Sequence, residues 1–102
     1  MAAVSLDHAL VLAAVLFAIG FAGLLTRRNL IVGLACIEIM LNAAGLAFVA
    51  AGARWGQADG QVMFLFVLAM AAAEVAVGLA IAIRFRQSVK SLDIDDADQM
   101  RG

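Results

Sequence analysis

The chain has 102 residues, of which 66% are hydrophobic and 15% charged, and its formal net charge is −1. A soluble domain this small is about half apolar and about a quarter charged, because its large surface must be covered with polar groups. The composition therefore excludes a soluble globule and predicts an integral membrane protein. The balanced charge argues against a nucleic-acid-binding protein. The single cysteine, Cys36, excludes an internal disulfide and a thiolate metal site.

Three long apolar runs account for most of the chain, and charged residues mark their ends. The runs are 9–26, which has no charge, 30–53, which contains only Glu38, and 62–83, which contains only Glu74. About 20 apolar residues cross the hydrocarbon core of a bilayer as a helix, the form in which a backbone satisfies its own hydrogen bonds. We therefore expect an all-α integral membrane protein, one unit over 1–102, with transmembrane helices at about 6–26, 30–53 and 62–83 and a tail at 84–102.

The first apolar run has the length of either a signal peptide or a retained helix. A signal peptide usually opens with basic residues, but the polar residues before this run are Asp7 and His8. No Arg or Lys precedes Arg27. We therefore expect a retained transmembrane helix.

The connections between the runs indicate the orientation. Arg27–Asn29 is so short that the first two helices must be antiparallel neighbours, and the second connection, 54–61, has its expected turn at Asp59–Gly60. The second connection carries Arg54 alone. The other six basic residues lie in the first connection and the tail: Arg27, Arg28, Arg84, Arg86, Lys90 and Arg101. The positive-inside rule therefore places the first connection and the tail in the cytoplasm and the N-terminus outside, in the periplasm.

Two glutamates lie inside the apolar runs, where a charged side chain is expensive. Glu38 comes ten residues after Arg28, and Glu74 comes ten residues before Arg84. Ten residues rise about 15 Å along a helix, so both carboxyl groups are expected near mid-membrane at the same depth. Insertion scales put comparable charged residues at the centre of a membrane helix at about 2.5–3.5 kcal/mol each. The matched pair therefore predicts a functional, protein-facing position for both side chains.

Desolvation gives such a pair a chemistry. Burial disfavours the charged form of a carboxyl group, and a second carboxyl group nearby disfavours it further, so the pair can take up and release protons. We hypothesise a proton relay through Glu38 and Glu74, with Asn42 as a hydrogen-bonding support for Glu38 or for a partner helix. The alternative is that both glutamates are neutral and only hold partner helices together. Arg27 and Arg28 anchor the topology and are secondary candidates for shaping a cytoplasmic half-channel.

The tail contains an acidic run, Asp93–Asp98, that resembles the start of a calcium-binding loop. It lacks the glycine at the sixth position, and the chain ends before a glutamate at the twelfth. We therefore interpret it as a solvated tail or a docking segment.

Five segments carry a resemblance to a known family. They are Arg27–Leu30, Glu38–Asn42, Trp55–Val62, Ala71–Glu74 and Met100–Gly102. Because all five occur in order, and because length and span count agree, the whole chain resembles the subunit K family of bacterial respiratory complex I, homologous to the mitochondrial 4L subunit. The resemblance implies a multi-pass protein of the bacterial inner (plasma) membrane with three transmembrane helices and no cofactor in this chain.

The resemblance further implies a place in the proton-pumping NADH–quinone oxidoreductase. The family's subunit lies once per complex beside subunits A, J and H and leads towards the antiporter-like subunit N, while flavin, iron–sulfur clusters and quinone belong to partner subunits. Its two buried glutamates, which link quinone reduction to proton translocation, correspond to Glu38 and Glu74, and its loop arginines to Arg27 and Arg28. The chain would then be a non-redox subunit of an enzyme, with no bond-making catalytic site of its own.

Two other function classes remain as alternatives. A small C-type subunit of a multisubunit cation/proton antiporter is related to this family, and the buried glutamates alone do not distinguish it. The segments Trp55–Val62 and Met100–Gly102 favour complex I. A rotor-ring proteolipid usually has two spans and one essential carboxylate, and a small multidrug exporter has four spans with a carboxylate in the first, so both are disfavoured.

Overall fold

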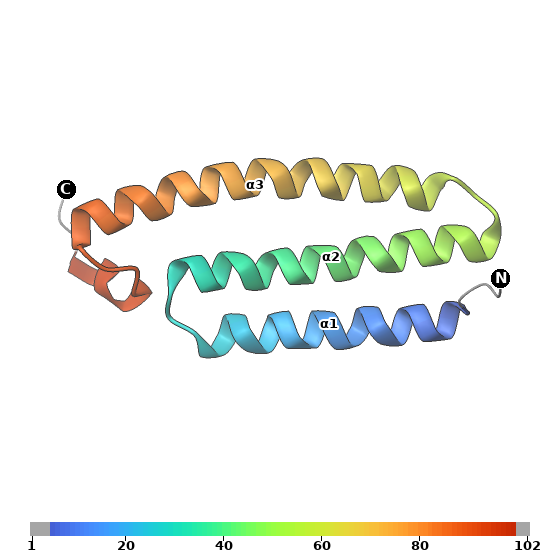
Figure 1. The fold of residues 1–102 in the computed structure, drawn as a ribbon, viewed down its shortest axis with the longest axis horizontal. Helices are drawn as coiled ribbons and strands as arrows, with labels where there is room; N and C mark the ends of the chain where they lie inside the picture. The colour runs from blue at the N-terminus through green and yellow to red at the C-terminus, as the bar shows by residue number, and fades with distance from the viewer. Residues whose placement is uncertain (1–4, 100–102) are drawn as a thin grey trace.

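The computed structural model describes residues 5–99, which form three long helices lying side by side and a short helix at one end (Figure 1). The elements are α1 (Leu6–Thr26), α2 (Leu30–Trp55), α3 (Asp59–Val89) and a 3-10 helix, η1 (Ile94–Gln99). α2 lies in the middle and packs against both α1 and α3. The predicted all-α fold is confirmed, and α1, α2 and α3 are each long and apolar enough to cross a membrane. Met100–Gly102, one of the five resembling segments, lies outside the described residues.

Local caps explain where the helices begin and end. The Ser5 hydroxyl accepts a hydrogen bond from the backbone N–H of His8 at the start of α1. At the start of α2, the Asn29 side-chain oxygen accepts from two backbone N–H groups of the first turn. α2 ends at Gly56, whose φ of 65° is a left-handed conformation that glycine adopts without strain. The short connection before α3 is therefore a capped helix end rather than a flexible loop.

The turn expected at Asp59–Gly60 is wrong, because both residues belong to the first turn of α3. The chain reverses instead over 56–58, where Gly56 supplies the unusual backbone angle. Gly60 has a different role: it is buried against α2, where there is no space for a side chain. An Asp-Gly pair is a strong turn signal, but here close packing explains the glycine.

α3 is longer than its apolar run, 62–83, at both ends. The apolar run predicts only the part of the helix that lies in lipid. The helix itself can continue until a residue such as proline interrupts its backbone, and the sequence contains no proline. Arg86 lies in the last turn of α3, where a positive charge is favourable at the negative end of the helix dipole. The helix ends at Lys90, which has a φ of 65°.

Glycines fix the antiparallel register of α2 and α3 at two places. Close to the turn, a Cβ added at Gly52 would lie 3.0 Å from the Cα of Gly60, so these two backbones touch. Near the other end, a Cβ added at Gly78 would lie 2.8 Å from a methyl carbon of Leu34. Gly52 therefore stands opposite Gly60, and Leu34 stands opposite Gly78.

Gly60→Ala is expected to destabilise the α2–α3 contact, because the new Cβ would collide with the backbone oxygen of Phe48, which cannot move aside. Overpacking of this kind costs about 1–3 kcal/mol. The measurement is the midpoint of thermal unfolding of the detergent-solubilised protein, which should fall. Gly33→Ala is the matched control, since its Cβ would meet only a Leu24 methyl at 3.8 Å, an ordinary contact. Equal midpoints for the two variants would contradict the close packing at Gly60.

Few side chains are buried inside this single chain. The buried apolar residues are small: Ala13, Cys36, Ala43, Ala71 and Ala82. Large apolar side chains such as Val11, Phe66 and Val77 are about 60% exposed (62%, 62% and 60%). A set of exposed apolar faces on every helix is what a chain surrounded by lipid or by other membrane subunits presents.

Candidate functional site: two carboxyl groups at one level of the α2–α3 seam

Glu38 lies on the face of α2 that packs against α3. Residues four and seven apart share one face of a helix. Glu38 follows Leu34 by four residues and precedes Gly45 by seven. Both of these neighbours contact α3, Leu34 through Gly78 and Gly45 through the ring of Phe64. The carboxyl group therefore belongs to the α2–α3 seam rather than to the α1 side of the helix.

Glu74 lies on the corresponding side of α3. It follows Ala71 by three residues and precedes Gly78 by four, so the three residues share one side of the helix. Ala71 is 7% exposed, and Gly78 contacts Leu34 of α2. Glu74 itself is half-buried. Its position is thus at the same seam as that of Glu38.

The helix register brings the two glutamates to one level. Leu34 stands opposite Gly78. In an antiparallel pair, each step forward on α2 is matched by a step back on α3. Glu38 is four residues after Leu34, and Glu74 is four residues before Gly78. Their backbones therefore stand opposite each other across the seam, which agrees with the equal depth expected from the flanking arginines.

Glu38 has an unsatisfied carboxyl oxygen. The side chain is half-buried, and its Oε1 atom is shielded and has no hydrogen-bond partner among the described residues. Buried polar atoms are nearly always hydrogen-bonded, and an unpartnered one is expensive. Glu38 therefore places a shielded polar atom at the seam that the described part of this chain leaves without a partner.

The predicted supporting residues do not join this pair. Asn42 is exposed, and within residues 5–99 no hydrogen bond links its side chain to Glu38, so its support for a partner helix stays a prediction. Arg27 and Arg28 are exposed in the α1–α2 connection. Arg28 is ten residues, about 15 Å of helix rise, from Glu38. The arginines thus lie at the end of the bundle and not at the seam.

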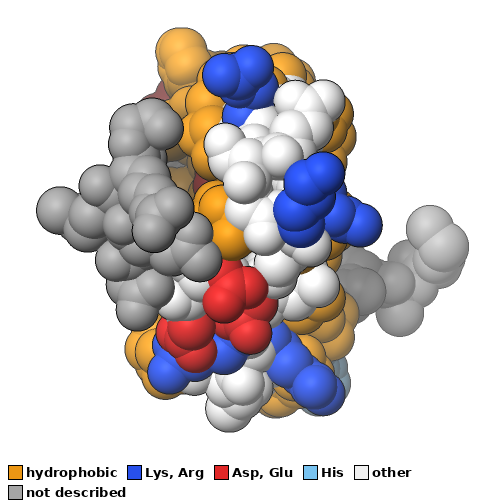
Figure 2. Space-filling model, turned by 90° about the vertical axis from the view of Figure 1, so that its left-hand side faces the viewer, with side chains coloured by type: hydrophobic (Ala, Val, Ile, Leu, Met, Phe, Trp, Pro, Cys, Tyr) orange, Lys and Arg blue, Asp and Glu red, His pale blue; other side chains and the backbone are white. Residues whose placement is uncertain are grey.

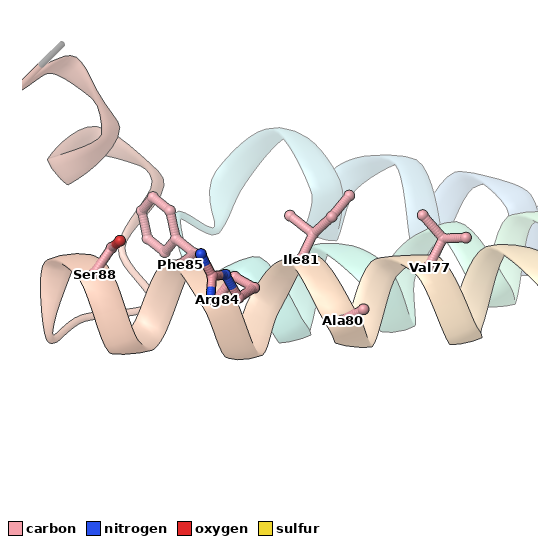
Figure 3. A pocket seen from close by; sticks show the side chains of 6 residues that line it. All are labelled: Val77, Ala80, Ile81, Arg84, Phe85 and Ser88. Atoms are coloured by element: carbon pink, nitrogen blue, oxygen red, sulfur yellow. The ribbon is translucent and has the colours of Figure 1, made fainter. Parts of the chain in front are cut away.

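The hollows of the surface do not add a second site. One lies on the surface of α3 and is lined by six residues of that helix, as Figure 3 shows: Val77, Ala80, Ile81, Arg84, Phe85 and Ser88. Its lining is mainly apolar, and neither glutamate contributes to it. Within the described part of the chain, no group of three or more His, Cys, Asp or Glu residues is placed to hold a metal ion. The seam is therefore the place where buried polar chemistry gathers.

Sequence reasoning missed the partner of the Arg28 side chain and the place of the tail. The tail folds back onto the α1–α2 connection, and the Nε atom of Arg28 lies 3.8 Å from a carboxylate oxygen of Asp95. Within the acidic run, residues 93–94 contact this connection through the backbone while Asp93 and Asp95 stay exposed, so each interpretation describes part of the segment. A signal was available in Leu92 and Ile94, two apolar residues within a polar tail, although it does not name the docking surface.

Comparison with known proteins places the chain in a family. Residues 8–102 match the family described as NADH-ubiquinone/plastoquinone oxidoreductase chain 4L. The chain is 65% identical to the NADH-quinone oxidoreductase subunit K of Methylococcus capsulatus, and 60% identical to that of Nitrosospira multiformis. It is 56% identical to the subunit K of Pseudomonas paraeruginosa, and each of these alignments covers 100% of both chains. The family resemblance expected from the sequence is confirmed: the chain belongs to the 4L family of NADH-quinone oxidoreductase subunits.

Proposed function

We propose that this chain is a membrane-arm subunit of a proton-pumping NADH–quinone oxidoreductase, in which Glu38 and Glu74 form part of the path that couples quinone reduction to proton translocation. The observation that supports this role is the position of the two glutamates opposite each other across the α2–α3 seam. Two carboxyl groups at one depth suit proton transfer along the plane of the membrane, because no movement across the bilayer is needed between them.

The chemistry needs groups that hold and pass a proton. A proton moves between a carboxyl group and a partner within about 2.6–3.2 Å, directly or through one water. No hydrogen bond joins Glu38 to Glu74 among the residues that the structure describes, so bridging waters or partner side chains would connect them. The unpartnered oxygen of Glu38 marks one such connection. In this chain the glutamates take up and release protons and form no covalent intermediate with a substrate.

The proposal includes a location and a set of neighbours. The α1–α2 connection and the tail lie at one end of the bundle, and the N-terminal end of α1 lies at the other (Figure 1). We assign the end with the α1–α2 connection and the tail to the cytoplasm and the opposite end to the periplasm, in the inner (plasma) membrane of a bacterium. One copy per complex would lie beside the A, J, H and N-type subunits, with flavin, iron–sulfur clusters and quinone held by partner subunits and no cofactor here.

The experiment that tests membership is capture of the chain through an affinity tag from detergent-solubilised native membranes. We expect flavin, iron–sulfur clusters and NADH oxidation by an artificial acceptor to be captured with it, in a ratio of one chain per complex. Capture of a cation/proton antiporter without flavin would instead support the C-type alternative. Labelling of Ser91→Cys in a Cys36→Ala background, in vesicles of known sidedness, checks the orientation, and reaction only from the periplasmic side would reverse it.

A further inference from the structure

The described part of the tail makes a specific backbone contact with the α1–α2 connection. The backbone N–H of Leu30 donates to the carbonyl oxygen of Leu92 at 2.9 Å, and the N–H of Ile94 donates to the carbonyl of Arg28 at 2.8 Å. These two bonds flank an antiparallel bridge between Asn29 and Asp93. They also satisfy the N–H of Leu30, one of the first-turn donors of α2 that has no partner inside its own helix. Without this contact with the tail, the backbone N–H of Leu30 would need another hydrogen-bond acceptor, such as water.

Side chains add an apolar and an ionic contact to the bridge. Leu92 lines one hollow together with Ile31 of α2 and with Leu79 and Ile83 of α3, so the tail lies beside both helices there. The Arg28–Asp95 pair, at 3.8 Å, is about two-thirds exposed on both sides (66% and 67%), so its contribution is small. Figure 2 shows the acidic side chains of this end of the molecule lying among basic ones. The two backbone hydrogen bonds are therefore the contacts that hold the tail.

The tail is also shaped by contacts of its own. At Lys90 the backbone turns with a φ of 65°. The Ser91 hydroxyl then accepts from the N–H of Asp93 at 2.9 Å, and a carboxylate oxygen of Asp93 accepts from the N–H of Asp95 at 2.9 Å. These local bonds give the segment turns on either side of the bridge. Local contacts and the bridge to the α1–α2 connection together define its docked shape.

We propose that residues 91–96 are a strap that ties the end of α3 to the α1–α2 connection and holds Arg28 in position. α1 and α3 each pack on α2, and the strap adds a direct link from α3 to the connection that joins the other two helices. Arg28 is held from both sides of its residue, by its carbonyl oxygen and by its guanidinium group. The strap thus links the end of α3 to the start of α2 at this end of the bundle. The existence of the strap does not depend on the proposed function. Only the measurement of proton pumping described below rests on the proposed function.

The bridge gives a direct test by disulfide trapping in the intact complex. Asn29 and Asp93 form a pair without mutual hydrogen bonds, for which the Cα atoms lie about 4.5 Å apart, within the disulfide range of about 4.4–6.8 Å. In a Cys36→Ala background, Asn29→Cys with Asp93→Cys should form a disulfide under mild oxidation, seen as loss of two maleimide-reactive thiols. Adding Ile94→Pro removes one bridging N–H and should slow trapping about tenfold. Ile94→Ala keeps that N–H and should not slow it.

Reversible rescue tests what the strap does. Ile94→Pro should lower proton pumping, while NADH oxidation by an artificial acceptor stays normal and affinity capture of the chain with flavin shows that the complex has assembled. Forming the 29–93 disulfide in this variant should restore pumping, and reduction should remove it again. The Cys36→Ala parent, treated in the same way, controls for the oxidant. Failure of the two cysteines to join, or trapping at one rate in the proline and alanine variants, would overturn the strap. Trapping without rescue would leave no role for it in holding Arg28.

Discussion

Membranes that carry Glu38→Gln are expected to oxidise NADH normally with an artificial acceptor and to lose NADH–quinone reduction and proton pumping. Gln keeps the shape of the side chain and its place at the α2–α3 seam, but it cannot take up or release a proton. Proton transfer by a positioned side chain contributes about 10²–10⁴-fold to a rate, so a fall of about 100-fold or more in the coupled rates is expected. The measurements are NADH oxidation with both acceptors and the proton gradient formed by inverted vesicles.

The control is the same kind of change at a carboxylate outside the seam. Asp59→Asn removes a negative charge in the first turn of α3, where the side chain is exposed. It should leave both activities and the gradient normal. Normal quinone reduction and a normal gradient in Glu38→Gln would contradict the relay at this residue, leaving Glu38 as a packing residue and Glu74 as the only remaining candidate.

The choice of Glu38 over its neighbour Asn42 rests on burial. Glu38 has a shielded oxygen without a partner among residues 5–99, whereas Asn42 is exposed on the chain. An exposed amide can be satisfied by whatever covers that face, but a shielded oxygen in the seam must be satisfied there. Asn42→Ala is therefore a milder change than Glu38→Gln, unless a partner helix depends on the amide.

The sequence predicted the three helices because the bilayer restricts what an apolar run can do. Each run must be a helix of about 20 residues, and α1, over Leu6–Thr26, agrees with the span predicted from composition. The C-terminal ends of α2 and α3 were harder to predict. They depend on the backbone angles of Gly56 and Lys90. Hydrophobicity contains no information about those angles.

Two separate arguments, one from the sequence and one from helix packing, put Glu38 and Glu74 at the same level. Equal distances from the flanking arginines placed Glu38 and Glu74 at equal depth, and the contact of Leu34 with Gly78 places them on one level through packing. The sequence did not predict which neighbouring helix the face that carries each glutamate packs against. Small residues occur on several faces of both helices, and only the contacts of Gly45 and Gly78 select the seam.

The tail shows the limit of sequence reasoning most clearly. Its docking depends on backbone groups of Arg28 and Leu30, and backbone groups are the same in every residue. The residue types in the α1–α2 connection therefore do not predict that its backbone will pair with a segment about 60 residues later. The acidic residues suggested a partner with positive charge, but the exposed pair with Arg28 is the weakest of the contacts.

Combining Glu38→Gln with Glu74→Gln is expected to reduce proton pumping no further than the more severe single variant does. If the two carboxyl groups lie on one path at one level, replacing either one already blocks proton transfer along that path. The losses of pumping rate in the two single variants then do not add in the double variant. Two glutamates on separate paths would instead give losses that multiply. The initial rate of gradient formation in inverted vesicles, normalised to NADH oxidation by an artificial acceptor, measures all three variants against the parent. A double variant that falls by the product of the two single effects would contradict a shared path. That result would be difficult to reconcile with side chains whose helix positions stand opposite each other across the α2–α3 seam.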